Sequence, residues 1–241
     1  MPRRTIWSAG TWPPWRTTLR GQIGRPSRSF TLQQSQALLE AARESRLNAY
    51  AVLSLATGIR TEEARELHWE HVDLDGDPNA VRPVPPSVAV WRSVRQGGDT
   101  KTAKSRRTLA LPQAAVQALR EHRKRQAEER LVAGALWQDH GLVFASAIGT
   151  PLDAANVRRE FRKVTEAAGL GPDWAPRDLR HTFVSLMSAD GVPIEEIARL
   201  AGHNRTATTE LVYRHELRPV ITTGAEVMDR ILNASGRQNR S

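Results

Sequence analysis

The sequence predicts an α+β domain that is mainly helical and contains one small antiparallel β-sheet. Apolar residues recur at helical spacing along most of the chain, as at Val157, Phe161 and Val164. Residues 72–111 differ, because they combine turn-forming residues with short runs that are typical of strands. The chain has 241 residues, a length that suits one large domain with a short extension.

The helices are placed by their start and stop signals. Thr31-Leu-Gln-Gln34 has the capping-box pattern of a helix N-terminus, and Gly58 is expected to end the second helix. Pro112 suits the start of a later helix, where its missing N–H costs nothing. Further helices are expected over residues 48–56, 61–67, 112–130, 153–168, 176–189, 192–200, 206–213 and 223–232.

Apolar runs predict the sheet. Residues 88–91 and 107–111 are expected to be strands on either side of a polar turn. Residues 142–144 are expected to form another short strand.

The two ends of the chain differ from its centre. Residues 1–27 are rich in Pro, Gly and Arg and show no periodicity, so we expect a disordered basic tail. Such a tail is either an arm that follows DNA or a linker. The ordered domain is expected over residues 28–235, with a disordered tail at 236–241.

Composition narrows the classes of function. Lys and Arg outnumber Asp and Glu by 35 to 26, a formal charge of +9, which favours either a polyanionic partner such as nucleic acid or a merely solubilising surface. The absence of cysteine excludes disulfides, zinc-thiolate sites and thiol nucleophiles. The sequence has no apolar run of about 18 residues and no secretory signal pattern, so we expect a cytoplasmic, nucleoid-associated protein.

Basic clusters and a late tyrosine follow one another along the chain. The clusters are Thr57-Gly-Ile-Arg60 with Glu63, Arg177-Asp-Leu-Arg180-His181-Thr182, and Leu200-Ala-Gly-His203; Tyr213 follows His203 by ten residues. Cleavage of a phosphodiester by a protein hydroxyl needs a nucleophile, cations around the charged transition state and an acid for the leaving oxygen. Arginine suits the second role because its planar fork binds two phosphate oxygens. No metal or other cofactor is expected.

In their order and spacing these motifs resemble the tyrosine recombinase, or phage integrase, family. The resemblance implies a DNA recombinase that cuts and rejoins strands through a 3′-phosphotyrosyl link on Tyr213. The other catalytic residues that it implies are Arg60, Lys101, Arg177, Arg180 and His203.

Lys101 matches the acid that the family carries in a β-hairpin of pattern Lys-Thr-x-x-Ser-x-Arg, and Lys104 is the alternative. Further DNA contacts are expected from Arg106, Arg107 and Arg205.

Two neighbours of the catalytic arginines are expected to support the site rather than react. Glu63 would orient the region around Arg60, and His181 is expected to be structural. Arg177 departs from the family pattern, which usually has histidine there; arginine can bind phosphate but cannot act as a base near neutral pH. Tyr50 lies in an apolar helix and is expected in the core.

The family resemblance also bears on organisation and partners. It covers residues 28–235, and the N-terminal core-binding domain that forms the second jaw of the DNA clamp is expected to be absent. The expected partner is double-stranded DNA at attachment sites, in a tetrameric synapse, with possible accessory or directionality factors and no membrane. The segment after Tyr213 resembles integrases of actinobacterial mobile elements. Two alternatives stay open: an inactive DNA-binding remnant of an integrase, and a type IB topoisomerase-like enzyme.

Overall fold

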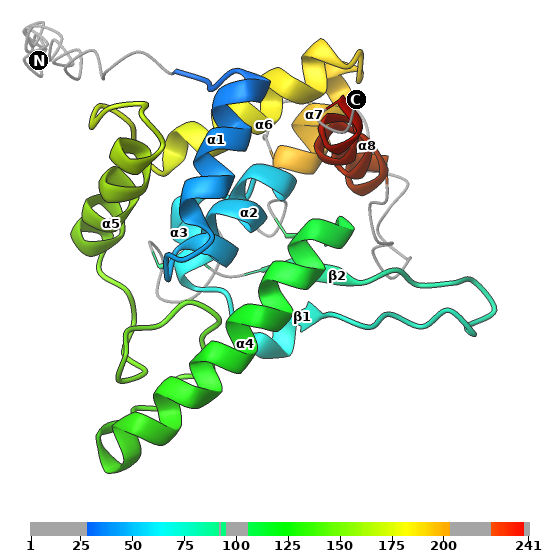
Figure 1. Ribbon diagram of the computed structural model, residues 1–241. Helices are drawn as coiled ribbons and strands as arrows, with labels where there is room; N and C mark the ends of the chain where they lie inside the picture. The colour runs from blue at the N-terminus through cyan, green and yellow to red at the C-terminus, as the bar shows by residue number, and fades with distance from the viewer. Residues whose placement is uncertain (1–27, 92, 95–105, 203–222, 239–241) are drawn as a thin grey trace, which may run out of the picture.

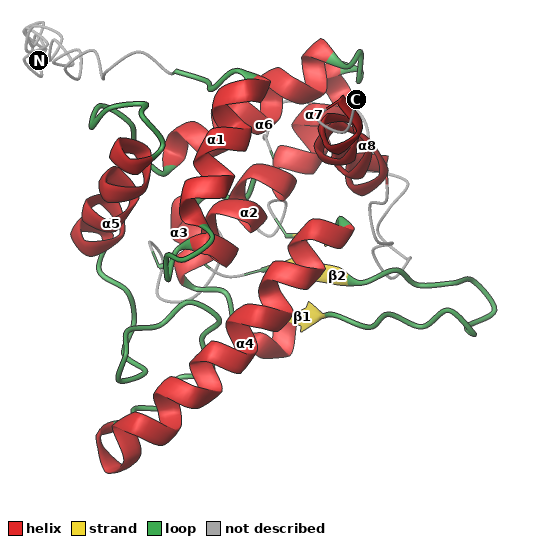
Figure 2. Cartoon of the chain, in the orientation of Figure 1, coloured by secondary structure: helices red, strands yellow, loops and turns green. Residues whose placement is uncertain are grey.

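The computed structural model describes residues 28–91, 93–94, 106–202 and 223–238 (Figure 1). Its helices are α1 Leu32–Ala42, α2 Asn48–Thr57, α3 Thr61–Arg65, α4 Gln113–Ala133, α5 Ala154–Ala167, α6 Arg177–Ala189, α7 Ile194–Ala201 and α8 Thr223–Gln238, with short 3₁₀ turns at Trp69–His71 and Gly134–Leu136. The strands are β1 Val72–Asp73, β2 Ser87–Val90 and β3 Arg107–Ala110. Figure 2 shows that helices make up most of this part of the chain, which confirms the predicted fold class.

Helix α2 is the centre of the core. All of its residues are buried, and it packs against α1, α4, α6 and α8. Tyr50 is fully buried in α2, as predicted, with its ring 5.3 Å from that of Phe144. Because the surrounding helices cover α2, its two ends are fixed in position, and the C-terminal end leads directly to Arg60.

The start and stop signals place most helices correctly. Thr31 and Gln34 form the capping box of α1, with the Thr31 hydroxyl 3.1 Å from the Gln34 amide nitrogen. Gly58 ends α2 in a left-handed conformation, with φ at 62°. The side chain of Asp153 caps α5 by accepting from the Ala155 and Asn156 amides.

The strands form one antiparallel sheet in the order β1-β2-β3. In the β2–β3 pair, Val88 lies opposite Leu109 and Val90 lies opposite Arg107. The two predicted strands therefore pair as a hairpin, and the pairing ends at Arg107. The sequence between these strands contains Lys101 and Lys104, which lie outside the described residues.

Several predicted boundaries were wrong. Residues 142–144 form no strand: Leu142 makes a single bridge to His68, and the Gln126 amide and the His122 ring bind the carbonyls of Leu142 and Val143 in place of a neighbouring strand. Helix α3 ends before Leu67, and α8 continues to Gln238, beyond the predicted end of this helix at residue 232. The expected tail at 1–27 and the helix at 206–213 lie outside the described residues. No helix in the described ranges has the length and apolar character needed to span a bilayer.

Candidate active site

Arg60 lies at the turn that joins α2 to α3. Its backbone N–H donates to the Glu63 carboxylate at 2.9 Å, and its Nη1 lies 2.5 Å from Glu63 Oε1. Glu63 sits three residues later on α3, so its side chain reaches back over the helix start. The turn and the ion pair together restrict the Arg60 side chain to one side of the α2–α3 junction.

Glu63 is shared by a second arginine from the sheet. Arg107 Nη2 lies 2.9 Å from Glu63 Oε2 and its Nη1 lies 3.3 Å from Oε1. Both residues are buried, with 3% of Glu63 and 5% of Arg107 exposed. Burial raises the pKa of Glu63, but the charges and hydrogen bonds of Arg107 and then Arg60 outweigh it and hold that pKa below its ordinary value. The carboxylate is therefore ionised at neutral pH.

The same two arginines cap the C-terminus of α7. Arg60 Nη2 donates to the Gly202 carbonyl at 2.6 Å, and Arg107 Nε donates to the Leu200 carbonyl at 2.8 Å. Carbonyls in the last turn of a helix lack helical partners, and the helix dipole favours cations there. The end of α7 is thus held against α3 and β3, and His203 follows Gly202 directly in the sequence.

Gly202 is needed at this contact for two reasons. Its φ is 68°, a left-handed conformation that glycine adopts without strain. A Cβ at this position would also lie 2.9 Å from Arg107 Nη1. The absence of a side chain lets the guanidinium of Arg107 lie against the backbone.

Arg180 approaches the α2–α3 turn from α6. Its Nη1 donates to the Gly58 carbonyl at 2.6 Å, while its buried Nη2 has no hydrogen-bond partner among the described residues. Burial, and then the charges of Arg60 and Arg107, lower the pKa of Arg180 to about 9, so it stays charged at neutral pH. A half-buried cation with an unused donor near a second arginine is suited to bind an anion such as a phosphate.

Arg177 and His181 flank Arg180 on the same helix. About half of the Arg177 side chain is exposed, and its Nε lies 3.9 Å from a carboxylate oxygen of Asp178. Asp178 is itself buried and accepts from the Ala175 amide at 2.8 Å, at the start of α6. Neither Arg177 nor the half-buried His181 contacts Glu63 in the interactions of the described chain. Arg180 is the residue of this motif that we group with Arg60, Glu63 and Arg107 as the arginine cluster, because the charges of Arg60 and Arg107 lower its pKa.

Arg107 corrects one prediction. We expected it to contact DNA, but in the described chain its side chain is buried against Glu63 and Leu200. The signal that sequence reasoning missed is its alternation with Leu109 and Leu111: residues two apart on a strand share a face, and this face is buried. Arg106, by contrast, is exposed.

The remaining predicted residues lie outside the described chain. These are Lys101, Lys104, His203, Arg205 and Tyr213. The structure therefore brings together Arg60, Glu63, Arg107 and Arg180. Within the described ranges, no group of three or more His, Asp and Glu side chains has an arrangement that could hold a metal ion.

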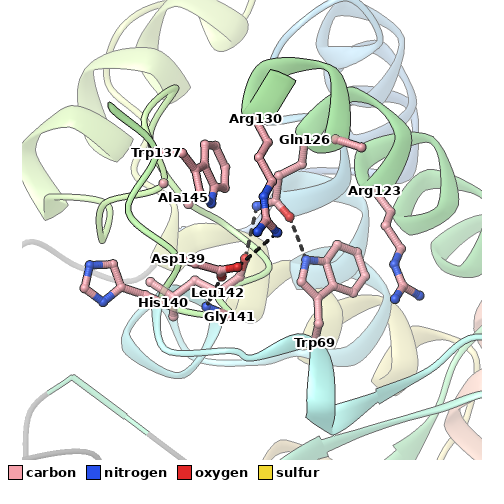
Figure 3. A pocket seen from close by; sticks show the side chains of 12 residues that line it. Trp69, Arg123, Gln126, Arg130, Trp137, Asp139, His140, Gly141, Leu142 and Ala145 are labelled. Atoms are coloured by element: carbon pink, nitrogen blue, oxygen red, sulfur yellow. Dashed lines mark hydrogen bonds and ion pairs between the residues drawn. The ribbon is translucent and has the colours of Figure 1, made fainter. Parts of the chain in front are cut away.

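A separate hollow of about 300 Å³ lies between α4 and the loop at residues 137–149 (Figure 3). Trp69 and Trp137 line it, and the ion pair of Arg130 with Asp139, at 2.9 Å, closes one side. Gln126, on α4, also lines the hollow, and its side-chain oxygen accepts a hydrogen bond from the Trp69 indole at 2.7 Å. None of the predicted site residues lines it.

Two proteins are similar in sequence to this chain over most of its length. An integrase of Streptomyces ambofaciens is 58% identical over 214 residues, which are 88% of this chain and 55% of that protein. A XerC-like tyrosine recombinase of Caldanaerobacter subterraneus subsp. tengcongensis is 28% identical over 212 residues, 83% of this chain and 54% of that protein. The chain thus spans about half the length of these relatives.

Solved structures share the fold. XerA recombinase matches with a TM-score of 0.58 and 23% identity, over 90% of this chain and 67% of that one. The integrase of the Tn1549 transposon, in complex with transposon right end DNA, matches with a TM-score of 0.60 and 16% identity, over 91% of this chain and 68% of that one. The catalytic core of lambda integrase matches with a TM-score of 0.52 and 18% identity, over 74% of this chain and 96% of that one.

The architecture is therefore that of tyrosine recombinase catalytic domains. The profile of the phage integrase family matches residues 28–218, which include every predicted site residue from Arg60 to Tyr213. From this match, and from the extent of the likeness to the Streptomyces integrase, the chain belongs to the phage integrase family.

Proposed function

We propose that this chain is a site-specific DNA recombinase whose residues 28–235 form the catalytic domain. The observation that carries the proposal is the buried Nη2 of Arg180, which has no hydrogen-bond partner among the described residues and lies beside the charge of Arg60. A DNA phosphate matches this site in charge and in the geometry of its oxygens. Family membership and the position of Tyr213 support the assignment.

In the proposed reaction, the Tyr213 hydroxyl oxygen attacks the scissile phosphorus, and the hydroxyl proton passes to solvent water. The bond from phosphorus to the 5′ oxygen breaks, and that oxygen takes a proton from Lys101. The product is a 3′-phosphotyrosyl link and a free 5′-hydroxyl, and rejoining reverses both steps with another strand's hydroxyl. Because the link retains the energy of the phosphodiester, no nucleotide cofactor is consumed.

The basic residues share the charge of the transition state. Arg60 and Arg180 would bind the non-bridging phosphate oxygens, with His203 and Arg177 as further donors. The half-exposed position of Arg177 suits a contact with the DNA backbone better than a role in proton transfer. Arg106, Lys104 and Arg205 are proposed contacts to neighbouring phosphates.

The proposed partner is double-stranded DNA at an attachment site. The formal charge of +9 favours this partner, and a related protein, the Tn1549 transposon integrase, has been solved with circular intermediate DNA. Exchange of strands between two duplexes would take four protomers, with accessory factors setting the direction. Sedimentation of the protein with and without the duplex measures the size of this assembly.

Covalent trapping tests the function. The full chain is incubated with nicked duplexes that tile the chromosomal junctions on either side of its gene, so that cleavage releases a short strand and cannot be reversed. A protease-sensitive DNA–protein adduct on a denaturing gel is the expected result, and Tyr213→Phe should abolish it. Tyr50→Phe is the matched control, because the Tyr50 hydroxyl is buried without a partner among the described residues and burial raises its pKa.

Other outcomes point to the alternative functions. Binding in a gel shift without an adduct would contradict the proposal and favour a non-catalytic DNA-binding remnant. An adduct combined with relaxation of supercoiled plasmid, but without strand exchange between two sites, would favour a topoisomerase-like enzyme.

A further inference from the structure

We propose that Arg107 is a positioning residue of the recombination site: it fixes the Glu63 carboxylate and the end of α7, and thereby holds Arg60 against the scissile phosphate. Arg107 itself is buried and touches no DNA in this arrangement. The inference rests on the function proposed above.

Glu63 links the position of Arg107 to that of Arg60, because both of its carboxylate oxygens are shared by these two arginines. Oε1 receives Arg60 Nη1 and Arg107 Nη1, and Oε2 receives the Arg60 backbone N–H and Arg107 Nη2. The bonds of each arginine therefore fix the orientation of the Glu63 carboxylate that the other arginine meets. Without Arg107, Glu63 would keep two oxygens for Arg60 alone, and the Arg60 guanidinium would be free to turn toward them.

The end of α7 closes the network into a ring. Arg60 binds the Gly202 carbonyl and Arg107 binds the Leu200 carbonyl, two residues apart at one helix terminus. The two arginines are thus joined twice, through Glu63 and through α7. A ring of this kind fixes the Arg60 guanidinium more tightly than a single ion pair can, because a movement of one member strains every contact.

The ring also joins three segments that are far apart in the sequence. Glu63 lies on α3, Arg107 opens β3, and Leu200 lies in the last turn of α7. Arg107 and Glu63 are 44 positions apart, and Arg107 and Leu200 are 93 apart. A purely stabilising role would need only the buried ion pair, and ion pairs of that kind add little net stability. The geometry instead suits the precise placement that catalysis requires.

The first experiment is a double-mutant cycle on single-turnover cleavage, with Arg107→Met, Glu63→Gln and the double variant. The substrate is the duplex that wild type traps best. Each single change should slow cleavage about 100-fold, as expected for a misplaced catalytic group. The double change should also slow it about 100-fold rather than 10⁴-fold, because Arg107 acts through Glu63. Arg120→Met is the control. Arg120 makes an exposed ion pair with Asp75, so this variant should cleave at the wild-type rate.

A second substrate separates the phosphate-binding side of the site from the leaving-group side. A sulfur in place of the bridging 5′ oxygen leaves without a proton, because thiols are far more acidic than alcohols. Lys101→Ala should recover on this duplex. Arg107→Met should stay about 100-fold slow on it, because its defect lies in holding the phosphate through Arg60. If the cleavage rate of Arg107→Met recovered fully on this duplex, Arg107 would act through the proposed acid Lys101, and the proposal would be overturned.

Folding is checked in each variant by thermal unfolding and gel shift. Arg107→Lys keeps the charge, but its donors all lie on one nitrogen and cannot reach Glu63 and Leu200 together, so its rate should lie between those of wild type and Arg107→Met. The double variant removes both members of the buried Arg107–Glu63 pair and should be more stable than either single variant. Multiplicative losses in the cycle, or a loss of folding in all of these variants, would overturn the proposal. An absence of adduct in wild type would instead contradict the proposed function itself.

Discussion

The guanidinium of Arg180 donates to the carbonyl of Gly58 at 2.6 Å, although the two residues are 122 positions apart. One turn further along α6, Phe183 packs on the same glycine so closely that a Cβ there would lie 2.5 Å from the Phe183 ring. Helix α6 is thus docked on the turn that carries Arg60. This contact sets the separation of the two arginines that we propose to bind the phosphate.

Replacing Arg180 should stabilise the free protein while it abolishes cleavage. In Arg180→Met a desolvated charge without an acidic partner among the described residues is removed, so we expect a gain of about 1 kcal/mol, or about 2–4 °C in Tm. Arg177→Met on the same helix should change stability by less than about 0.5 kcal/mol, because Arg177 is half exposed. Calorimetry of the three proteins measures both. A lower Tm for Arg180→Met would show that its bond to Gly58 outweighs the cost of burial.

Small oxyanions should occupy the same site. Sulfate or inorganic phosphate at about 100 times its dissociation constant should raise the free energy of unfolding by about 2.7 kcal/mol if it binds only the folded state. The rise in Tm should be absent in Arg180→Met, and chloride at equal ionic strength is the control for screening. An equal rise in both proteins would mean that the anion binds elsewhere.

Gly202 should tolerate a methyl group less well than another glycine of similar backbone conformation. Gly202→Ala combines a left-handed φ with a Cβ 2.9 Å from Arg107 Nη1, whereas Gly191 has φ at 83° and open space around its Cβ position. Gly191→Ala should cost about 1 kcal/mol for backbone strain alone. Gly202→Ala should cost about 1–3 kcal/mol more, and it should slow cleavage because Arg107 is displaced. Urea unfolding of both variants gives the difference, and equal costs would contradict a steric role for Arg107.

The stabilising effect of Glu63 should disappear in acid. Because Arg107 and Arg60 hold the folded-state pKa of Glu63 below its ordinary value, the ionised carboxylate stabilises the fold fully above that ordinary value. The effect is lost as the pH falls through the folded-state pKa. The difference in stability between wild type and Glu63→Gln should therefore shrink between about pH 5 and pH 3. Denaturant unfolding at a series of pH values measures it, with Glu160→Gln, from an exposed pair with Lys163, as the control. A difference that is constant over this range would mean that folding leaves the pKa of Glu63 unchanged, and a difference that grows in acid would mean that Glu63 is protonated in the folded state.

Local signals predicted much of the helical framework. The capping box at Thr31, the terminal Gly58 and the apolar face of α5 each depend on residues a few positions apart, which sequence reasoning can read. The strand expected at residues 142–144 failed for the opposite reason. Its carbonyls bind the side chains of Gln126 and His122, which lie 16 to 21 positions away in the sequence, so a local pattern cannot predict them.

The arginine cluster was only partly predictable. The motifs pointed to Arg60, Glu63 and Arg180, because each lies in a short pattern typical of the family. Arg107 is the last residue of the family's hairpin pattern, but the pattern alone gave it no partner, and we assigned it to DNA contact. Its true partner, Glu63, lies 44 positions away, and only the fold brings them together.

The buried arginine also discriminates between alignments of the β2–β3 hairpin. Arg106 and Arg107 are adjacent, so a slip of one residue could offer Arg106 to the Glu63 carboxylate. The same slip would turn Leu109 and Leu111 to the opposite face, away from the core. Only the observed pairing satisfies the Glu63 carboxylate and the apolar face together, so the ion pair and the buried leucines favour the same strand register.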